Sequence, residues 1–359
     1  MRHLLLLGSA LALVTSPAMA GKPVVTRGTP TAVVTPYATG FNNPRGLKFG
    51  PDGVLYVAEG GSGGLNSTQG QCTQVPDAGP YTGQPTGGGI SKVVEGNRVQ
   101  ITDQFPSSQT NPGLGGLVSG VADIAFVGDT LYALTAGSGC SHGVPETTNG
   151  IFKVSNGNIT IVADLSAYQK THPVAHPNPG DFEPDGTWYS MVAVRGALYA
   201  VEPNHGELDR ITTGGNISRV ADISASQGHI VPTSVAYHGT FYIGNLGGFP
   251  IEPGTEKIIQ VTPGGAVHTV ATGLTNVVGV AFDDRARMYV LENTTTAGFP
   301  QPGEGNIVRI SGGSKKVLVS GLDLPTAMTF GPDGALYVSD RGYGFPPGAG
   351  RILRIRLGD

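Results

Sequence analysis

The chain has 359 residues and a formal net charge of −4, and it contains 57 glycines and 27 prolines. Charged residues make up only 13% and hydrophobic residues 39%, which excludes a coiled coil and argues against intrinsic disorder. The chain has no excess of Lys and Arg to neutralise phosphates, so a nucleic-acid-binding protein is not expected. The glycines are therefore expected in the tight turns of a folded chain.

The first twenty residues predict an export signal. Arg2 and His3 precede an apolar run over residues 4–14, and Ala18 and Ala20 have the spacing of a cleavage site. The alternative is an anchor helix, but the apolar run is short for a bilayer, and no membrane span is expected elsewhere. We expect cleavage after Ala20 and a secreted or periplasmic protein with a single domain over residues 21–359.

A repeated unit organises the rest of the chain. Residues 46–57 return as residues 327–338, and each copy consists of a short strand, a Pro-Asp-Gly turn and a second strand. Weaker copies lie between them, and a third and a fourth strand follow each copy. One tyrosine marks each second strand: Tyr56, Tyr132, Tyr199, Tyr242, Tyr289 and Tyr337. Four strands per unit and a period of about 45 residues predict an all-β, six-bladed β-propeller.

The predicted blades span roughly residues 41–106, 119–166, 188–224, 231–274, 277–322 and 325–359. The last blade lacks a fourth strand, and an unassigned strand over residues 31–39 follows the predicted signal. We expect this N-terminal strand to complete the last blade, because the closed ring then has no open sheet edge.

Long insertions are concentrated in the first two blades. Residues 60–88 and 136–149 lie between second and third strands, whereas residues 106–120 and 167–187 join a fourth strand to the next first strand. Both loop types open on one face of a four-stranded blade, so all four insertions are expected on one side. Loops on one face of a rigid scaffold often carry function, and flexible decoration is the alternative.

The two cysteines lie in two of these insertions. Cys72 belongs to residues 60–88 and Cys140 to residues 136–149. Export into an oxidising compartment favours a disulfide between them, and two unpaired thiols are the alternative.

Oxygen-bearing side chains stand at the ends of the second strands. The residue three places after each marker tyrosine is a carboxylate or an amide at five of six positions, with Thr135 at the sixth. These five are Glu59, Glu202, Asn245, Glu292 and Asp340. A ring of such oxygens suits Ca²⁺, which takes six to eight oxygen ligands. The alternative is that these oxygens accept backbone N–H groups of the following glycine-rich turns.

Two arginines belong to the same predicted channel mouth. Arg45 begins the first strand of blade one, and Arg341 follows Asp340 directly. Each is expected either to form a salt bridge, for Arg45 with Glu59 or Asp340, or to bind an anion.

A further candidate metal site lies in residues 167–187. His172 and His176 share this loop with Asp181, Glu183 and Asp185, and zinc or copper accepts such ligands. No nucleophile elbow, zinc-protease helix, phosphate loop or dinucleotide fingerprint occurs in the sequence.

Several of these segments resemble the ScyD/ScyE family: residues 41–59, 164–168, 231–236 and 247–250. The resemblance covers nearly all of the chain after the signal. It implies an exported, NHL-type six-bladed propeller of a family that is named after the pigment scytonemin and has no established activity. In the related lactonase-type propellers such channel oxygens bind Ca²⁺. Glu59, Asn245 and Asp340 stand at matching positions, whereas Thr135, Glu202 and Glu292 depart from that pattern.

The first functional hypothesis is therefore a non-catalytic binding or scaffold module that holds a small molecule, a glycan or a protein on the looped face. The alternative is a Ca²⁺-dependent hydrolase or lyase with the ion held over the channel by the five oxygen positions. Quinoprotein sugar dehydrogenases share the six-bladed form, but no cluster of His and Arg occupies the channel positions to hold a quinone.

Overall fold

The computed structural model describes residues 32–358, so the predicted signal sequence lies outside the described residues. The first described strand, β1 (Ala32–Phe41), pairs antiparallel with the last one, β26 (Gly350–Leu357). The two ends of the described chain thus pair in one sheet. This agrees with the prediction that the N-terminal strand completes the last repeat.

The regular structure is almost entirely β, and four of its sheets contain four antiparallel strands each. In hydrogen-bonded order these sheets are β11 (Asn158–Asp164), β10 (Gly150–Ser155), β9 (Thr130–Thr135) and β8 (Val121–Val127); β12 (Ser190–Val194), β13 (Ala197–Glu202), β14 (Glu207–Thr212) and β15 (Ile217–Asp222); β16 (Pro232–Tyr237), β17 (Phe241–Asn245), β18 (Glu256–Val261) and β19 (Val267–Leu274); and β20 (Val277–Phe282), β21 (Met288–Glu292), β22 (Pro302–Ser311) and β23 (Ser314–Asp323).

The fifth sheet has ten strands and contains the first and the last repeats. Its main path runs through β2 (Pro44–Phe49), β3 (Leu55–Glu59), β5 (Thr82–Val94), β6 (Asn97–Gln109), β1, β26, β25 (Leu336–Asp340) and β24 (Ala327–Phe330), with β4 (Asn66–Ser67) and β7 (Val118–Ser119) beside it. The structure therefore has five hydrogen-bonded sheets, whereas the repeat predicted six separate ones. The physical reason is a single bridge, Thr39 to Asn97, by which the outermost strands β1 and β6 meet.

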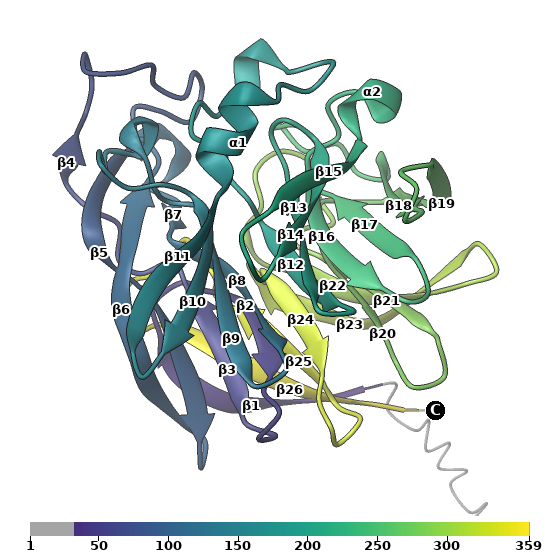
Figure 1. Ribbon diagram of the computed structural model, residues 1–359. Helices are drawn as coiled ribbons and strands as arrows, with labels where there is room; N and C mark the ends of the chain where they lie inside the picture. Colours follow the sequence, from purple (N-terminus) through teal and green to yellow (C-terminus); the bar gives the residue numbers. More distant parts are fainter. Residues whose placement is uncertain (1–31, 359) are drawn as a thin grey trace, which may run out of the picture. The chain divides into compact units, whose positions relative to one another are not determined.

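The first strands of the repeats form the inner ring of the fold. They contact one another in cyclic order, from β2 through β8, β12, β16, β20 and β24 back to β2. Figure 1 shows the sheets gathered around these strands. The all-β, propeller-like architecture predicted from the repeat is thereby confirmed.

The marker tyrosines explain why neighbouring repeats pack together. Five of the six lie against an aromatic ring of the next repeat, with ring centroids 4.5 to 5.2 Å apart. The last of these pairs, Tyr337 with Phe49, joins the final repeat to the first. Such aromatic contacts contribute about 0.5–1.5 kcal/mol each beyond the area they bury.

The Pro-Asp-Gly turns position these tyrosines. Asp52 accepts a hydrogen bond from the backbone N–H of Val54 at 3.1 Å and another from the Tyr56 hydroxyl at 2.9 Å. Gly53 has a φ of +73°, a conformation that residues other than glycine rarely adopt. The final repeat uses the same bonds, because Asp333 accepts from the Tyr337 hydroxyl at 3.0 Å. The motif therefore serves packing as well as chain reversal.

Within residues 32–358, short helices lie only in the connections. They are α1 (Leu165–Thr171), α2 (Ser224–Gln227) and the 3-10 helices η1 (Pro112–Leu114), η2 (Cys140–His142) and η3 (Pro179–Asp181). Asp164 caps α1 by accepting from the backbone N–H of Ala167 at 2.8 Å. Among residues 32–358, no helix is long and apolar enough to cross a membrane.

Candidate functional site

A cavity of about 840 Å³ lies on the axis of the ring. Each of the six inner strands contributes to its wall, at Arg45, Asp123, Ser190, Thr233, Val278 and Ala327. These residues stand near the amino ends of their strands, so the cavity opens at that end of the ring. Its size falls within the range of small-molecule sites.

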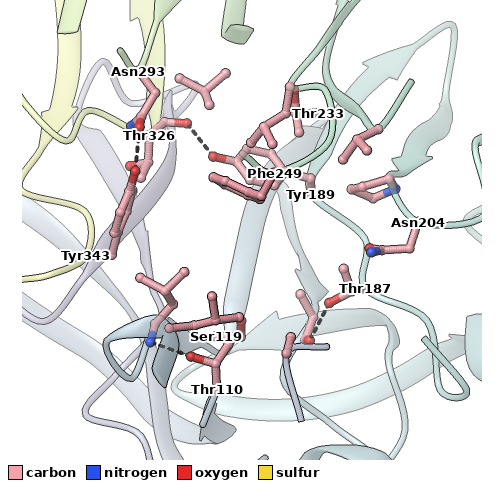
Figure 2. Close-up of a pocket in the computed structure, with 18 of the residues that line it drawn as sticks. Thr110, Ser119, Thr187, Tyr189, Asn204, Thr233, Phe249, Asn293, Thr326 and Tyr343 are labelled. Carbon is pink, nitrogen blue, oxygen red and sulfur yellow. Dashed lines mark hydrogen bonds between the residues drawn. The ribbon is translucent and has the colours of Figure 1, made fainter. Parts of the chain in front are cut away.

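All four long insertions reach this cavity, which agrees with the prediction that they lie on one face of the ring. Tyr81, Thr110, Ala136 and Asn178 represent one insertion each in the lining. Figure 2 shows lining side chains on all sides of an open space, with Thr110 and Ser119 facing Tyr189 and Phe249 across it. The insertions therefore form walls of a site.

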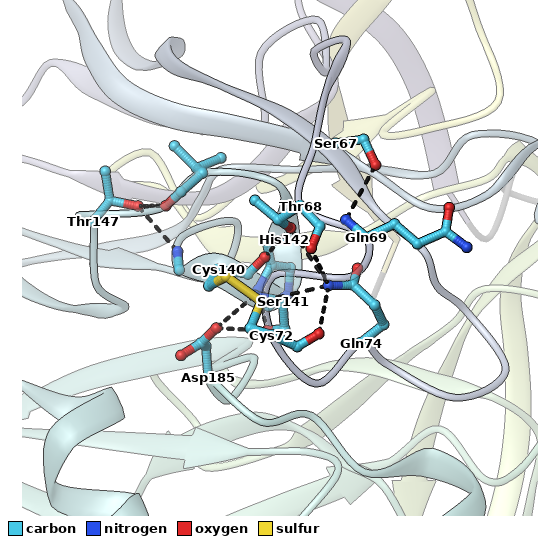
Figure 3. Close-up of a disulfide and its surroundings, with 12 residues drawn as sticks. Ser67, Thr68, Gln69, Cys72, Gln74, Cys140, Ser141, His142, Thr147 and Asp185 are labelled. Atoms are coloured by element: carbon cyan, nitrogen blue, oxygen red, sulfur yellow. Dashed lines mark hydrogen bonds between the residues drawn. A yellow bond between two sulfur atoms is a disulfide. The ribbon is translucent and has the colours of Figure 1, made fainter.

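The predicted disulfide between Cys72 and Cys140 is confirmed. It joins the insertion over residues 60–88 to the insertion over residues 136–149, and Thr68 reinforces the link by donating a hydrogen bond to the Cys140 carbonyl. Figure 3 shows Ser141 and His142 directly beside the disulfide. Closing a loop of 68 residues reduces the entropy of the unfolded chain by an amount worth about 4 kcal/mol.

The five predicted oxygen positions are buried within their own sheets and do not line the cavity. All five residues are at most 1% exposed. Four of them accept a backbone N–H from the connection that leads into the first strand of the same repeat. The donors are Asn42 to Glu59 (2.6 Å), Thr187 to Glu202 (2.9 Å), Thr275 to Glu292 (2.8 Å) and Asp323 to Asp340 (2.8 Å).

Cationic side chains complete three of these positions. Arg98 lies 2.9 Å from Glu59, Lys315 lies 3.4 Å from Glu292, and Arg351 lies 2.6 Å from Asp340. The carboxylates thus fasten loops and outer strands to the second strands. In the part of the chain that the structure describes, no group of three or more His, Cys, Asp or Glu side chains is placed to hold a metal ion. The structure therefore does not bring these oxygens together into one Ca²⁺ site.

Burial alters the titration of two of these carboxyl groups, Glu202 and Asp340. It raises the pKa of Glu202 to about 8, against the opposing effect of the backbone N–H groups of His205 and Thr187. Burial also raises the pKa of Asp340, although Arg351 opposes it.

The two candidate arginines have different surroundings. Arg341 forms an ion pair with Asp323 at 3.1 Å and does not line the cavity. Arg45 does line the cavity, where its guanidinium donates a hydrogen bond to the Val118 carbonyl. Glu59 and Asp340, its expected partners, are paired with other arginines.

The histidines of residues 167–187 do not gather with the acids of that loop. His172 stacks on Tyr168 with ring centroids 4.1 Å apart, and the backbone N–H of His176 donates to Ser224. Each acid has a different partner instead: His229 for Asp181 at 2.9 Å, His142 for Glu183 at 3.2 Å and Lys170 for Asp185 at 2.6 Å. Two of these partners, His229 and His142, attach the loop to other parts of the fold, whereas Lys170 lies within the loop itself.

The cavity presents polar residues that the sequence pattern did not single out. One of them is His229, which pairs on the cavity wall with Asp181 of the predicted metal loop. Others follow the predicted oxygen positions by one to three places: Asn204, Asn293 and Tyr343. Consecutive residues at a strand end point in different directions, so a residue just after a buried oxygen position can face the cavity. This short offset is the only mark of these residues in the sequence.

Two half-buried tyrosines of the cavity are hydrogen-bond donors at neutral pH. The Tyr189 hydroxyl donates to the Thr326 carbonyl at 3.2 Å, and the Tyr343 hydroxyl donates to the amide oxygen of Asn293. Burial raises the pKa of both phenols, while the nearby charge of Arg45 opposes the rise. Both hydroxyls therefore keep their protons.

No protein-family model and no curated protein matches the chain. Solved structures do resemble it. A provisionally assigned glucose dehydrogenase of Thermus thermophilus has 17% identity and a TM-score of 0.56, over 90% of this chain and 100% of that one. The PQQ-bound aldose sugar dehydrogenase of Streptomyces coelicolor has 14% identity and a TM-score of 0.50, over 91% and 98%. The fold is a β-propeller.

These likenesses correct the functional hypotheses drawn from the sequence. Proteins that share this propeller over nearly their whole length are named as glucose and aldose sugar dehydrogenases, so the expectation of a non-catalytic scaffold is wrong. The Ca²⁺-dependent hydrolase or lyase is also unsupported, because its five oxygen ligands are buried separately in different repeats.

Proposed function

We propose that this protein is an enzyme that acts on a hydroxyl group of a sugar or related polyol bound in the axial cavity. The observation that carries the proposal is the His229–Asp181 pair on a cavity wall that also bears uncharged hydrogen-bonding side chains. The sugar dehydrogenases among the solved neighbours support the same class of substrate.

The His229–Asp181 pair supplies a base. The His229 Nε2 atom lies 2.9 Å from Asp181 Oδ2, and the two side chains are 18% and 38% exposed. The carboxylate fixes the orientation of the imidazole, and Nδ1 forms no hydrogen bond to any of residues 32–358. A neutral histidine held in this way accepts a proton from a substrate hydroxyl at the free ring nitrogen.

The remaining walls can orient a polyol. Asn204 offers an amide group, while Tyr189 and Tyr343, whose protons bond to Thr326 and Asn293, offer hydroxyl oxygens as acceptors. A sugar hydroxyl both donates and accepts hydrogen bonds, and amides and hydroxyls match that behaviour without a fixed charge. A few placed polar groups in a partly apolar cavity are typical of small-molecule sites.

The cavity does not fit the PQQ named for the Streptomyces enzyme. PQQ carries three carboxyl groups and needs several cationic donors around it. Arg45 is the only Arg or Lys side chain of the described residues in the lining. Four carboxylates share that lining: Asp77, Asp123, Asp181 and Glu183. One guanidinium is too few for three carboxylates, so the residues of the cavity do not fit this cofactor.

Three finer features belong to the proposal. We count the ten-stranded sheet as two blades, because the Thr39–Asn97 bridge is the only strand pairing between its halves and six inner strands close the ring. Six blades with the cysteine-containing loop in the first agree with a ScyD/ScyE-like protein. The disulfide agrees with export to an oxidising compartment, secreted or periplasmic.

A sugar panel tests the function. The purified protein is incubated with aldoses, sugar acids and polyols, with and without an artificial electron acceptor, and products are followed by NMR. We expect conversion of at least one member, and His229→Gln should lower kcat about 10²- to 10⁴-fold. His238→Gln, at an exposed turn outside the cavity, is the matched control. Conversion that is insensitive to His229→Gln, or no conversion of any member, would refute the proposal.

A further inference from the structure

We propose that the substrate carries one carboxylate, which Arg45 binds, so that the substrate class is sugar acids rather than neutral sugars. This inference rests on the proposed function. Arg45 has no carboxylate partner, whereas other arginines near the same end of the ring are paired with a carboxylate.

Arg45 is half-buried in β2 and lines the cavity. Its guanidinium donates a hydrogen bond to the Val118 carbonyl, and no carboxylate of residues 32–358 lies within ion-pair distance. Other arginines at the ends of these repeats are paired, as Arg98 is with Glu59 and Arg351 with Asp340. Charges removed from bulk water are usually paired, so an unpaired guanidinium in a cavity points to an anionic ligand.

The competing carboxylate on the inner ring is already neutralised. Asp123 lies 3.4 Å from Lys48 and accepts hydrogen bonds from the backbone N–H groups of Ile124 and Met191, both at 2.8 Å. Its oxygens are therefore occupied, and the Arg45 guanidinium, which contacts Val118 and Tyr189, has further N–H groups for another partner.

The other lining carboxylates come from the insertions. Asp181 pairs with His229 and Glu183 with His142, whereas Asp77 lies on the first insertion. These groups leave Arg45 as the one site for an anion in the described lining, and they disfavour ligands with several negative charges. A single carboxylate matches the planar fork of one guanidinium, which can bind it through two parallel hydrogen bonds.

Neutral phenols surround the same guanidinium. The charge of Arg45 acts on the hydroxyls of Tyr81, Tyr189 and Tyr343, yet burial keeps the pKa of each phenol raised. Protonated hydroxyls carry no negative charge, so they do not repel a bound carboxylate. The amide of Asn204 remains available for the hydroxyl groups of the sugar.

Calorimetric titration with three matched ligands tests the inference. Glucuronate carries the carboxylate, glucuronamide replaces it by a neutral amide of the same shape, and glucose lacks it. We expect the protein to bind glucuronate about 30-fold or more tightly than the other two. Arg45→Gln should abolish this preference, and Arg45→Lys should keep part of it, because Lys retains the charge but not the planar fork.

The controls separate binding from folding and from the proposed function. Arg195→Gln, at an exposed turn, should leave all three affinities unchanged, and thermal melting should show that the Arg45 variants are folded. Equal affinity for all three ligands, or an equal loss of all three in Arg45→Gln, overturns the inference but leaves a sugar-binding cavity. Binding of none of the three, together with no conversion in the sugar panel, overturns the proposed function itself.

Discussion

Two sets of polar residues lie at the same end of the propeller, only a few positions apart in the sequence, and they have different tasks. Glu59, Glu202, Glu292 and Asp340 are buried in the repeats and bind backbone N–H groups. Asn204, Asn293 and Tyr343 follow three of them closely and face the cavity.

The difference teaches that position along a strand does not determine role. A carboxylate at the last position of a second strand is held inside the sheet, where it fastens a loop. The next residues have left the ladder, so their side chains can turn toward the axis. Removal of a buried carboxylate should therefore affect stability, whereas removal of a cavity group should affect binding.

The largest effect is expected for Glu59→Ala. This change leaves Arg98 and the backbone N–H of Asn42 without their partner in a buried site. The free energy of unfolding should fall by about 3 kcal/mol, because the buried pair is broken on one side only. Urea unfolding followed by circular dichroism measures the change.

A control variant and a binding measurement accompany that experiment. Glu252→Ala, at an exposed position, should change stability by less than about 0.5 kcal/mol. The folded fraction of Glu59→Ala should bind sugars as the parent protein does. Loss of sugar affinity with unchanged stability would place Glu59 in the binding site and contradict the separation of the two sets.

A smaller effect is expected for Tyr343→Phe. The variant loses the hydroxyl that bonds to Asn293, but that amide keeps its hydrogen bond to the Pro325 carbonyl. Stability should change by about 1 kcal/mol or less, while the affinity for the best sugar of the panel should fall about tenfold. Calorimetry on the parent and the variant measures this, with Tyr242→Phe as the control, because its hydroxyl bonds to Gln260 outside the cavity.

The smallest effect concerns the pair His142 and Glu183, which joins two of the insertions. Burial by itself lowers the pKa of His142, but the Glu183 carboxylate at 3.2 Å raises it overall. Because the folded pKa is the higher one, the pair stabilises the protein fully below the unfolded pKa of about 6.5 and loses that contribution as pH rises through the folded value.

The melting temperature therefore tests this pair. The difference between the parent protein and His142→Asn should be greatest near pH 6 and should shrink as the pH is raised toward about 9. A difference that stays constant over this interval would show that His142 is not charged in the folded protein. Sugar affinity should change less than in Tyr343→Phe, because His142 is fully buried behind the cavity wall.

The sequence by itself determined the repeat and the main features that the repeat implies. The alternation of apolar residues, the Pro-Asp-Gly turns and the six tyrosines predicted the strands, because turn chemistry and side-chain periodicity are local properties. The fourth strand missing from the last repeat predicted the pairing of β1 with β26. The positions of Cys72 and Cys140 in neighbouring insertions predicted their disulfide.

Only the tertiary structure decided which polar groups reach the axis. The partners of Glu59 and Glu292 include backbone N–H groups, which no sequence pattern marks. His229 and Asp181 are 48 positions apart and meet because two connections fold over the same end of the ring. The sequence indicated Arg45 as a candidate for a salt bridge or for anion binding. Whether it has a carboxylate partner depends on the positions of all other charged groups, which only the folded structure determines. Side-chain direction at strand ends and long-range pairing of loops are properties of the closed ring, and these properties form the site.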